Sequence, residues 1–211
     1  MHRSRALVAA VVTVLLAPVP AVWADDFEGT AGADEIVGTA RGDTVLARAG
    51  DDVVRTRAGK DFVSGGGGND RVVAGAGKDM AYGGAGDDVL RGGRDADALT
   101  DWVPTSFDST GPADDDLLVG GAGADLVGIT RGVDTVRAGA GNDLVKLAAD
   151  GVADSVLCGP GRDRVLYYGL AVDPLDVLVG CERVRSVTPG VPTAQRARWT
   201  RPSSHTGPSD S

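Results

Sequence analysis

The stretch GGGGNDRVVAGAGKDMAYGGAGDDVLR, residues 65–91, consists of three nine-residue units laid end to end. In each unit an aspartate stands sixth and an apolar residue stands eighth, with the single exception that the small Ala81 fills the eighth place after Asp79. Small residues rich in glycine precede each aspartate. A fixed short period is typical of solenoids, in which each repeat packs only on its neighbours. The stretch therefore predicts a repeat architecture.

The same period continues on both sides of this stretch. It runs without a slip from Asp34 to Asp97, is lost over residues 100–115, and resumes at Asp116. We therefore expect one block of repeats at 25–99 and a second at 116–185, separated by an irregular insertion. The insertion holds Trp102 and Phe107, which we expect to cover the side of the stack. With only nine aromatic residues and 32 glycines in the chain, a thin core of Val, Leu and Ile is expected.

The length of the repeat predicts an all-β fold. Nine residues are too few for a helical crossover between parallel strands. They suffice for a six-residue turn and a three-residue strand, so that two repeats make one coil of a flattened spiral. Strands one coil apart would then stack in parallel, about 4.8 Å apart. The eighth residue of each repeat would face the core, and the seventh and ninth would face solvent.

The acidic residues point to a cation. The chain has 27 aspartates but only three glutamates, and its formal net charge of −9 argues against nucleic-acid binding. Carboxylates that repeat at strand spacing repel one another unless cations lie between them. Carboxylate and main-chain oxygens without histidine or thiol suit Ca²⁺ better than Mg²⁺. The candidate metal ligands are Asp34, Asp43, Asp52, Asp61, Asp70, Asp79, Asp88, Asp97, Asp116, Asp125, Asp134 and Asp143.

Four repeats carry a family resemblance: GGGGNDRVV at 65–73, GGAGDDVLR at 83–91, GGAGADLVG at 120–128 and AGAGNDLVK at 138–146. They resemble the nonapeptide repeats of RTX, or hemolysin-type, calcium-binding proteins. The resemblance implies a parallel β-roll, a right-handed, β-helix-like solenoid with calcium between turns two repeats apart. It implies paired ligands, which would be Asp52 with Asp70, Asp70 with Asp88, Asp61 with Asp79, and Asp125 with Asp143. Main-chain carbonyls would complete the sites, from Gly65, Gly66, Gly68, Gly83, Gly84, Gly86, Gly120, Gly121 and Gly123.

Some repeats depart from the family pattern. The fourth-position glycine is replaced by Arg41, Asp95, Asp114 and Val152, so we expect weaker sites at Asp43, Asp97, Asp116 and Asp154. Lys60 and Lys78 stand directly before their aspartates and should weaken the sites at Asp61 and Asp79.

The two ends of the chain differ from the repeats. Residues 1–24 have a basic start and a short apolar run, which is typical of a secretory signal peptide, and the run is too short to span a bilayer. Loss of Arg3 and Arg5 with this segment would bring the net charge from −9 to −11. We therefore expect a secreted protein without membrane insertion. Residues 186–211 are rich in Pro, Ser and Thr and are expected to be a disordered tail.

Cys158 and Cys181 are the two cysteines of the chain. An even count in an exported protein favours a disulfide over two unrelated thiols. We expect this bridge to cap the second block.

Catalysis is the weaker functional hypothesis. After removal of the signal peptide, His205 in the tail is the only histidine, which excludes histidine-ligated zinc and a Ser-His-Asp triad. The sequence therefore predicts a non-enzymatic, secreted calcium-binding protein that folds around its ions on export. The alternative is a cell-surface adhesion or spacer module that uses the calcium-stiffened roll. The sequence identifies neither an envelope partner nor an oligomeric state.

Overall fold

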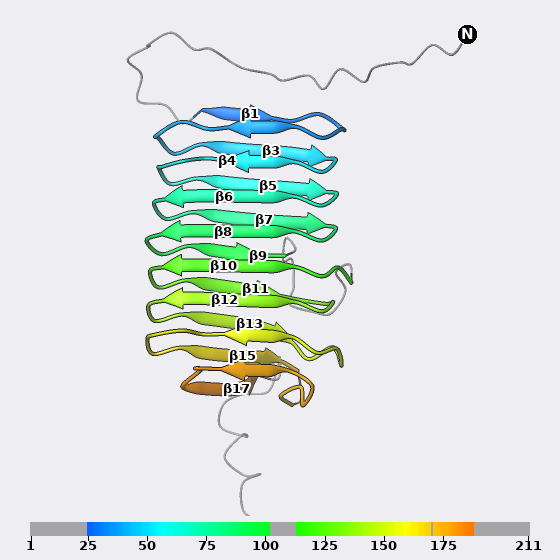
Figure 1. Cartoon of the computed structure of the whole chain (residues 1–211), viewed down its shortest axis with the longest axis vertical. Helices are drawn as coiled ribbons and strands as arrows, with labels where there is room; N and C mark the ends of the chain where they lie inside the picture. Colours follow the sequence, from blue (N-terminus) through cyan, green and yellow to red (C-terminus); the bar gives the residue numbers. More distant parts are fainter. Residues whose placement is uncertain (1–24, 102–112, 170, 188–211) are drawn as a thin grey trace, which may run out of the picture.

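A computed structural model describes residues 25–101, 113–169 and 171–187 of the chain, and these residues form a parallel β-solenoid (Figure 1). They contain no helix, and so none long and apolar enough to cross a membrane. The strands are β1 (Asp26–Glu28), β2 (Glu35–Val37), β3 (Thr44–Ala49), β4 (Val53–Arg55), β5 (Phe62–Gly67), β6 (Arg71–Ala76), β7 (Met80–Ala85), β8 (Val89–Arg94), β9 (Ala98–Thr100), β10 (Leu117–Ala122), β11 (Leu126–Ile129), β12 (Thr135–Ala140), β13 (Leu144–Ala148), β14 (Ser155–Leu157), β15 (Arg164–Tyr168), β16 (Val177–Val179) and β17 (Arg183–Val187).

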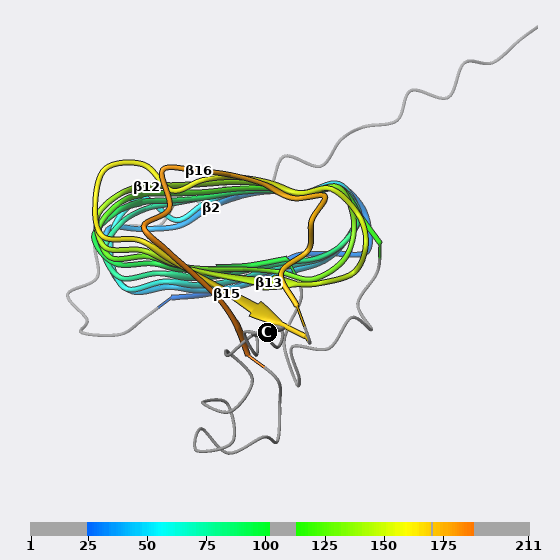
Figure 2. The ribbon, with the colours of Figure 1, turned by 90° about the horizontal axis from the view of Figure 1, so that it is seen from below.

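The strands alternate between two sheets. The odd-numbered strands form a nine-stranded sheet in the order β1 to β17, and the even-numbered strands form an eight-stranded sheet from β2 to β16. Paired strands are parallel and usually 18 residues apart, as in Phe62↔Met80. Viewed along the solenoid, the chain traces a flattened ring with one sheet on each long side (Figure 2). This arrangement confirms the all-β roll of nine-residue repeats with two repeats per coil.

The insertion does not divide the stack. Strand β8 pairs directly with β10, and β9 pairs directly with β11, although the paired residues are now 28 positions apart, as in Val89↔Leu117. The described repeats on both sides therefore form one continuous solenoid. The predicted cover by Trp102 and Phe107 lies outside the described residues.

Strands and turns have lengths other than those expected. Many strands span six residues, such as β6, and the turn before the next strand takes only three, Gly77, Lys78 and Asp79. The expectation of three-residue strands and six-residue turns holds at β1, β2 and β4 but was wrong for these longer strands. The reason is that the glycines keep their ladder partners, as in Gly75↔Gly93, so that the sheet continues through residues without large side chains.

The core contains two inward rows in place of the single row that was expected. The eighth residue of each repeat is buried, as predicted, and so is the first residue where it has a side chain, for example Ala47 and Leu147. The sequence did not predict an inward row at the first position, because this residue is often glycine or alanine and the position therefore shows no apolar periodicity. Its proximity to the aspartates bears directly on the candidate site.

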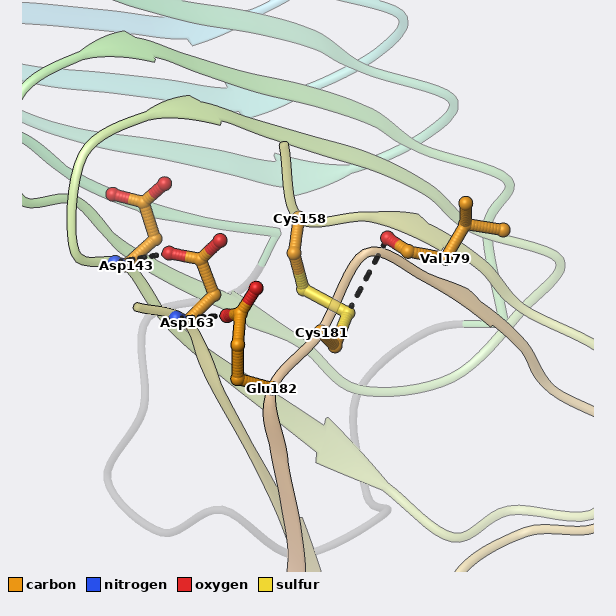
Figure 3. Close-up of a disulfide and its surroundings, with 6 residues drawn as sticks. All are labelled: Asp143, Cys158, Asp163, Val179, Cys181 and Glu182. Atoms are coloured by element: carbon orange, nitrogen blue, oxygen red, sulfur yellow. Dashed lines mark hydrogen bonds between the residues drawn. A yellow bond between two sulfur atoms is a disulfide. The ribbon is translucent and has the colours of Figure 1, made fainter. Parts of the chain in front are cut away.

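The C-terminal coil is tied to the solenoid by the bond between Cys158 and Cys181 (Figure 3). Cys158 is fully buried in a first position, and its Cα lies 5.2 Å from that of Cys181. Glu182 follows directly and occupies the place that aspartate holds in other repeats, ahead of β17. Strand β17 includes Ser186 and Val187, two residues that the sequence assigned to the tail. The remainder of that tail, residues 188–211, lies outside the described residues.

Candidate functional site

The aspartates form two ladders, one along each edge of the solenoid. Each aspartate directly precedes a strand, and the strands of the two sheets run in opposite directions (Figure 1). Asp34, Asp52, Asp70, Asp88, Asp116 and Asp134 therefore line one edge, and Asp43, Asp61, Asp79, Asp97, Asp125 and Asp143 line the other. All of these side chains are buried except that of Asp34, which is half-buried. Buried carboxylates at this density need partners.

One oxygen of each carboxylate holds the coils together. The Oδ1 atom of Asp70 accepts a hydrogen bond from the main-chain N–H of Asp52, one coil earlier, over 2.9 Å. Asp88 Oδ1 accepts in the same way from Asp70 over 2.8 Å. We call this hydrogen bond, from the main-chain N–H of one aspartate to Oδ1 of the aspartate one coil later, a rung. Rungs repeat along both ladders with N···O distances of 2.7–3.0 Å. Figure 3 shows the last rungs, in which Glu182 replaces an aspartate as acceptor.

These rungs bring together all four predicted ligand pairs. Besides the two already described, the N–H of Asp61 donates to Asp79 Oδ1, and that of Asp125 donates to Asp143 Oδ1, each over 2.9 Å. The carboxylates of a pair therefore belong to adjacent coils at the same edge. Each Oδ1 atom already accepts a hydrogen bond, so the binding of a further partner at the site depends on Oδ2.

The second oxygen is without a partner along most of the ladder. Among the described residues, ten buried aspartate Oδ2 atoms accept no hydrogen bond: those of Asp52, Asp61, Asp70, Asp79, Asp88, Asp97, Asp125, Asp134, Asp143 and Asp163. A buried anionic oxygen without a partner is costly, and native proteins contain few of them. Ten of one kind in register therefore indicate an ionic partner. Asp163 belongs to this set although the sequence analysis did not include it among the candidate ligands.

The first-position glycines allow some of these oxygens to lie close to the main chain. A Cβ atom added to Gly65 would lie 2.2 Å from Asp70 Oδ2 and 2.7 Å from the carbonyl oxygen of Gly83. A carboxylate oxygen and a carbonyl oxygen of the next coil thus lie beside the same glycine, closer than a residue with a Cβ would allow. The same arrangement recurs at Gly83 with Asp88, Gly92 with Asp97, and Gly120 with Asp125. We call these four places the open cradles.

Glycines at the second and fourth positions shape the surrounding turns. Gly66 and Gly68 have φ values of 117° and 113°, in the region that L side chains rarely adopt. A Cβ on Gly84 would lie 2.0 Å from the carbonyl oxygen of Gly66, so main-chain oxygens of one coil lie against the glycines of the next. Of the glycines predicted to supply carbonyl oxygens, Gly68, Gly86 and Gly123 therefore lie in the turns before the aspartates. The others lie near the ends of the strands that precede those turns.

Two of the predicted sites differ from the rest. The carboxylate of Asp43 accepts hydrogen bonds from the main-chain N–H of Thr39 over 2.7 Å and from its hydroxyl over 2.9 Å. Thr30 contacts Asp34 in the same way, over 2.5 and 3.0 Å. These threonines occupy the second position, where the repeats of the open cradles have glycine, so they take the place that a cation would need.

The expectation for Asp97 also changes. The residue in the fourth position there, Asp95, keeps a φ of 73°, so the turn has the conformation that glycine would give. Asp97 Oδ2 is unpartnered and Gly92 leaves its cradle open. The replacement of glycine therefore does not close this site.

Burial raises the pKa of the carboxylates, so they ionise less readily than in water. Desolvation raises the pKa of Asp70 to about 6 and that of Asp88 to about 8, with a further rise from neighbouring carboxylates. The same causes raise the pKa of Asp97 to about 7 and that of Asp125 to about 6. A bound cation would favour the ionised form at each of them. At neutral pH, binding of a cation would therefore stabilise the ladder, because it favours carboxylates in their ionised form.

The donor set fits a hard cation that takes main-chain oxygens. Within residues 25–101, 113–169 and 171–187, no three acidic, histidine or cysteine side chains come together as a metal-binding group. A metal at this edge would therefore need carbonyl oxygens besides carboxylates. Six to eight oxygens in flexible geometry are the preference of Ca²⁺.

Comparison with known proteins agrees with this chemistry. The family model of the RTX calcium-binding nonapeptide repeat matches in four copies, at residues 28–63, 64–99, 110–127 and 130–148, which together make up more than half of the chain. No curated protein matched the chain. With the repeat pattern, the parallel roll and the family match in agreement, the chain belongs to the family of RTX calcium-binding nonapeptide-repeat proteins.

Proposed function

We propose that this protein is exported and binds Ca²⁺ between the coils of the roll, first at the open cradles. The observation that carries the proposal is the convergence of an unpartnered carboxylate oxygen and a carbonyl oxygen on four first-position glycines, Gly65, Gly83, Gly92 and Gly120. The four carboxylates concerned are those of Asp70, Asp88, Asp97 and Asp125. The glycine carbonyls of the same turns would complete the coordination.

The remaining aspartates form a second class of sites. At Asp52, Asp79 and Asp143 the first-position residue is alanine, namely Ala47, Ala74 and Ala138, and its methyl group occupies part of the cradle. Asp61 and Asp134 face the larger Thr56 and Ile129. We propose that these positions bind more weakly than the open cradles. Asp34 and Asp43 come last, since threonine already occupies their carboxylates.

Calcium would also decide whether the roll is folded. Bound Ca²⁺ supplies the positive charge that the buried ladders lack, so its binding free energy becomes folding free energy. Extracellular calcium modules commonly bind with Kd values of about 10⁻⁴–10⁻³ M. With affinities in that range, the chain would remain loosely structured at low calcium and fold outside the cell. Residues 1–24 would direct that export and then be removed.

A binding role is preferred to a catalytic one. The rungs and cradles already give the aspartates of the two ladders a role without catalysis. After loss of residues 1–24, His205 would be the only histidine. No coherent set of nucleophile and base follows from the sequence. We therefore assign calcium, and neither nucleic acid nor a small-molecule substrate, as the ligand.

Calorimetric titration with Ca²⁺, followed by far-UV circular dichroism, tests the proposal. We expect about four tighter sites and a weaker class, with a change from coil-like to β spectra that a chelator reverses. A β spectrum that is the same in chelator and in Ca²⁺ would overturn coupled folding. Titration without heat at any calcium concentration would overturn binding itself.

A further inference from the structure

The two ends of the solenoid expose unpaired strand edges. Strands β1 and β2 end the two sheets on one side, and β17 and β16 end them on the other (Figure 1). An unpaired edge presents free N–H and C=O groups to any strand that can pair with it. We propose that the C-terminal end of one copy of this chain docks on the N-terminal end of a second copy, so that both sheets continue across the junction.

The outer side chains of the two odd-sheet edges carry opposite charges. Strand β1 reads Asp26-Phe27-Glu28, with both acidic residues exposed, and β17 begins Arg183-Val184-Arg185, with both arginines exposed. If the ladder register continued, Arg183 would stand opposite Asp26 of the second copy. The inward Val184 would meet Phe27. Directly opposed residues of unlike charge stabilise strand pairs.

The arginines of this end are available for such contacts. Arg164, Arg183 and Arg185 line a hollow of about 100 Å³ together with Leu166. Among the described residues the ion pairs are Arg48 with Glu28 and Arg55 with Glu35, so these three arginines have no acidic partner within that part of the chain. A cluster of unpaired cations on a protein of net charge −9 favours an acidic partner. The opposite end of the same chain is such a surface.

Apolar residues gather at the same end. Of the ten exposed large hydrophobic side chains in the described part of the chain, six belong to the last coils: Leu157, Val172, Leu175, Val177, Val179 and Val184. In register with the next copy, Val177 and Val179 of β16 would lie beside Glu35 and Val37 of β2, and the inward Leu178 would meet Ile36. Both sheets thus have apolar inward residues to bury at the junction. Such patches on a soluble protein mark interaction surfaces.

The aspartate rungs give the junction a direction. Each rung runs from a main-chain N–H to the carboxylate one coil later, as from Asp154 to Asp176 Oδ1 and from Asp163 to Glu182. No hydrogen bond among the described residues uses the N–H of Asp176 or Glu182 as a donor. At the other end, Asp34 Oδ1 and the Asp25 carboxylate accept no hydrogen bond from any residue that the structure describes. Donors at one end and acceptors at the other allow head-to-tail contact.

Like ends would repel each other. A two-fold axis makes the facing strands antiparallel, so two β1 edges would oppose Asp26 with Glu28, and two β17 edges would oppose Arg183 with Arg185. A two-fold symmetric dimer through either end is therefore disfavoured. A head-to-tail contact is heterologous and extends into an open chain of copies. The expected assembly is therefore a concentration-dependent linear series in place of a closed dimer.

Sedimentation velocity of the full chain in Ca²⁺ over a wide range of concentrations tests the inference. We expect species of two, three and more copies that grow with concentration and decline at high salt. Asp26→Arg and Arg183→Asp should each weaken association at least about tenfold, since each places like charges face to face. Arg71→Asp, in the same repeat position at mid-solenoid, is the matched control and should associate as the wild type does.

Mixing the two end variants gives the decisive result. The Arg183→Asp chain retains an acidic N-terminal edge and gains an acidic C-terminal edge, whereas the Asp26→Arg chain has basic residues at both. An equimolar mixture should regain association because the altered ends are again complementary. A wild-type chain that stays monomeric at every concentration would overturn the inference. Association insensitive to both substitutions, or variants that remain monomeric when mixed, would also overturn it. Circular dichroism of each variant establishes that loss of association is not loss of fold.

Discussion

The substitution Gly65→Ala isolates the open cradle from the rest of the fold. The added Cβ would lie 2.2 Å from Asp70 Oδ2, so the carboxylate must retreat by about 1.2 Å to reach ordinary contact at 3.4 Å. Calcium ligands lie at about 2.3–2.6 Å from the ion, and a shift of this size removes one of them. Gly65 has no positive φ, so its backbone conformation suits alanine, although the carbonyl oxygen of Gly83, 2.7 Å from the added Cβ, must shift as well.

The fold itself should accept this change. Alanine already occupies the first position at Ala47 and Ala74, where it is fully buried. We therefore expect Gly65→Ala to fold in Ca²⁺ but to lose one ion from the tighter class. If Ca²⁺ is present at about a hundred times Kd, the lost site lowers the free energy of unfolding by about 2.7 kcal/mol.

The control lies in the same turn. A Cβ on Gly67 would meet nothing within 4 Å, and its φ is not in the positive region. Gly67→Ala should therefore keep every ion and change stability by less than about 1 kcal/mol. Calorimetric stoichiometry and urea unfolding, each in Ca²⁺, measure both variants. An unchanged number of tighter sites in Gly65→Ala, or the same loss in Gly67→Ala, would refute the role of the cradle.

Three further predictions concern the ladder and its C-terminal end. Asp70→Ala should lower calcium affinity more than Asp43→Ala, because Thr39 already satisfies Asp43; equal losses in calorimetry would contradict this ranking. The calcium-free protein should be most stable below about pH 4 and lose stability as pH rises towards 8. The cause is that burial raises the folded-state pKa of Asp70 to about 6 and that of Asp88 to about 8, above the ordinary value of 3.8, so folding favours the protonated form. Thermal unfolding in chelator at several pH values checks this trend, and stability that increases with pH would contradict it. Replacing Cys158 and Cys181 by alanine should lower the free energy of unfolding by about 3 kcal/mol on the chain-entropy estimate for a loop of this length. Urea unfolding in Ca²⁺ measures the loss, and an unchanged midpoint would show that the bridge does not constrain the chain.

The repeat period accounts for most of what could be predicted. Asp70 and Val72 recur with their counterparts at fixed spacing, so the parallel pairing, the inward eighth residue and the two aspartate edges all follow from counting residues. The oxygen-rich set of candidate ligands indicated calcium, and the family resemblance added the pairing of the carboxylates. The insertion was harder to place, since the sequence between Thr100 and Asp116 has no period from which the pairing of β8 with β10 could be deduced.

The details of the site could not be predicted in this way. The sequence treated Asp43 as weakened by Arg41, whereas the carboxylate is in fact engaged by Thr39. It treated Asp97 as weakened by Asp95, which nevertheless adopts the turn conformation of glycine. Both outcomes depend on local backbone and side-chain geometry that spacing does not report.

The sequence by itself determined the solenoid, because a nine-residue period leaves room for nothing larger than a strand and a turn. It also determined the chemistry of the edges, since an aspartate in every repeat must stack on the next. Only the tertiary structure decided which aspartates have an open cradle. That property joins Asp70, Gly65 and the carbonyl of Gly83, which lies one full coil away from Gly65. Oxygens from adjacent coils meet beside Gly65 only after the chain has coiled, and the absence of a side chain at Gly65 allows them to approach the main chain so closely.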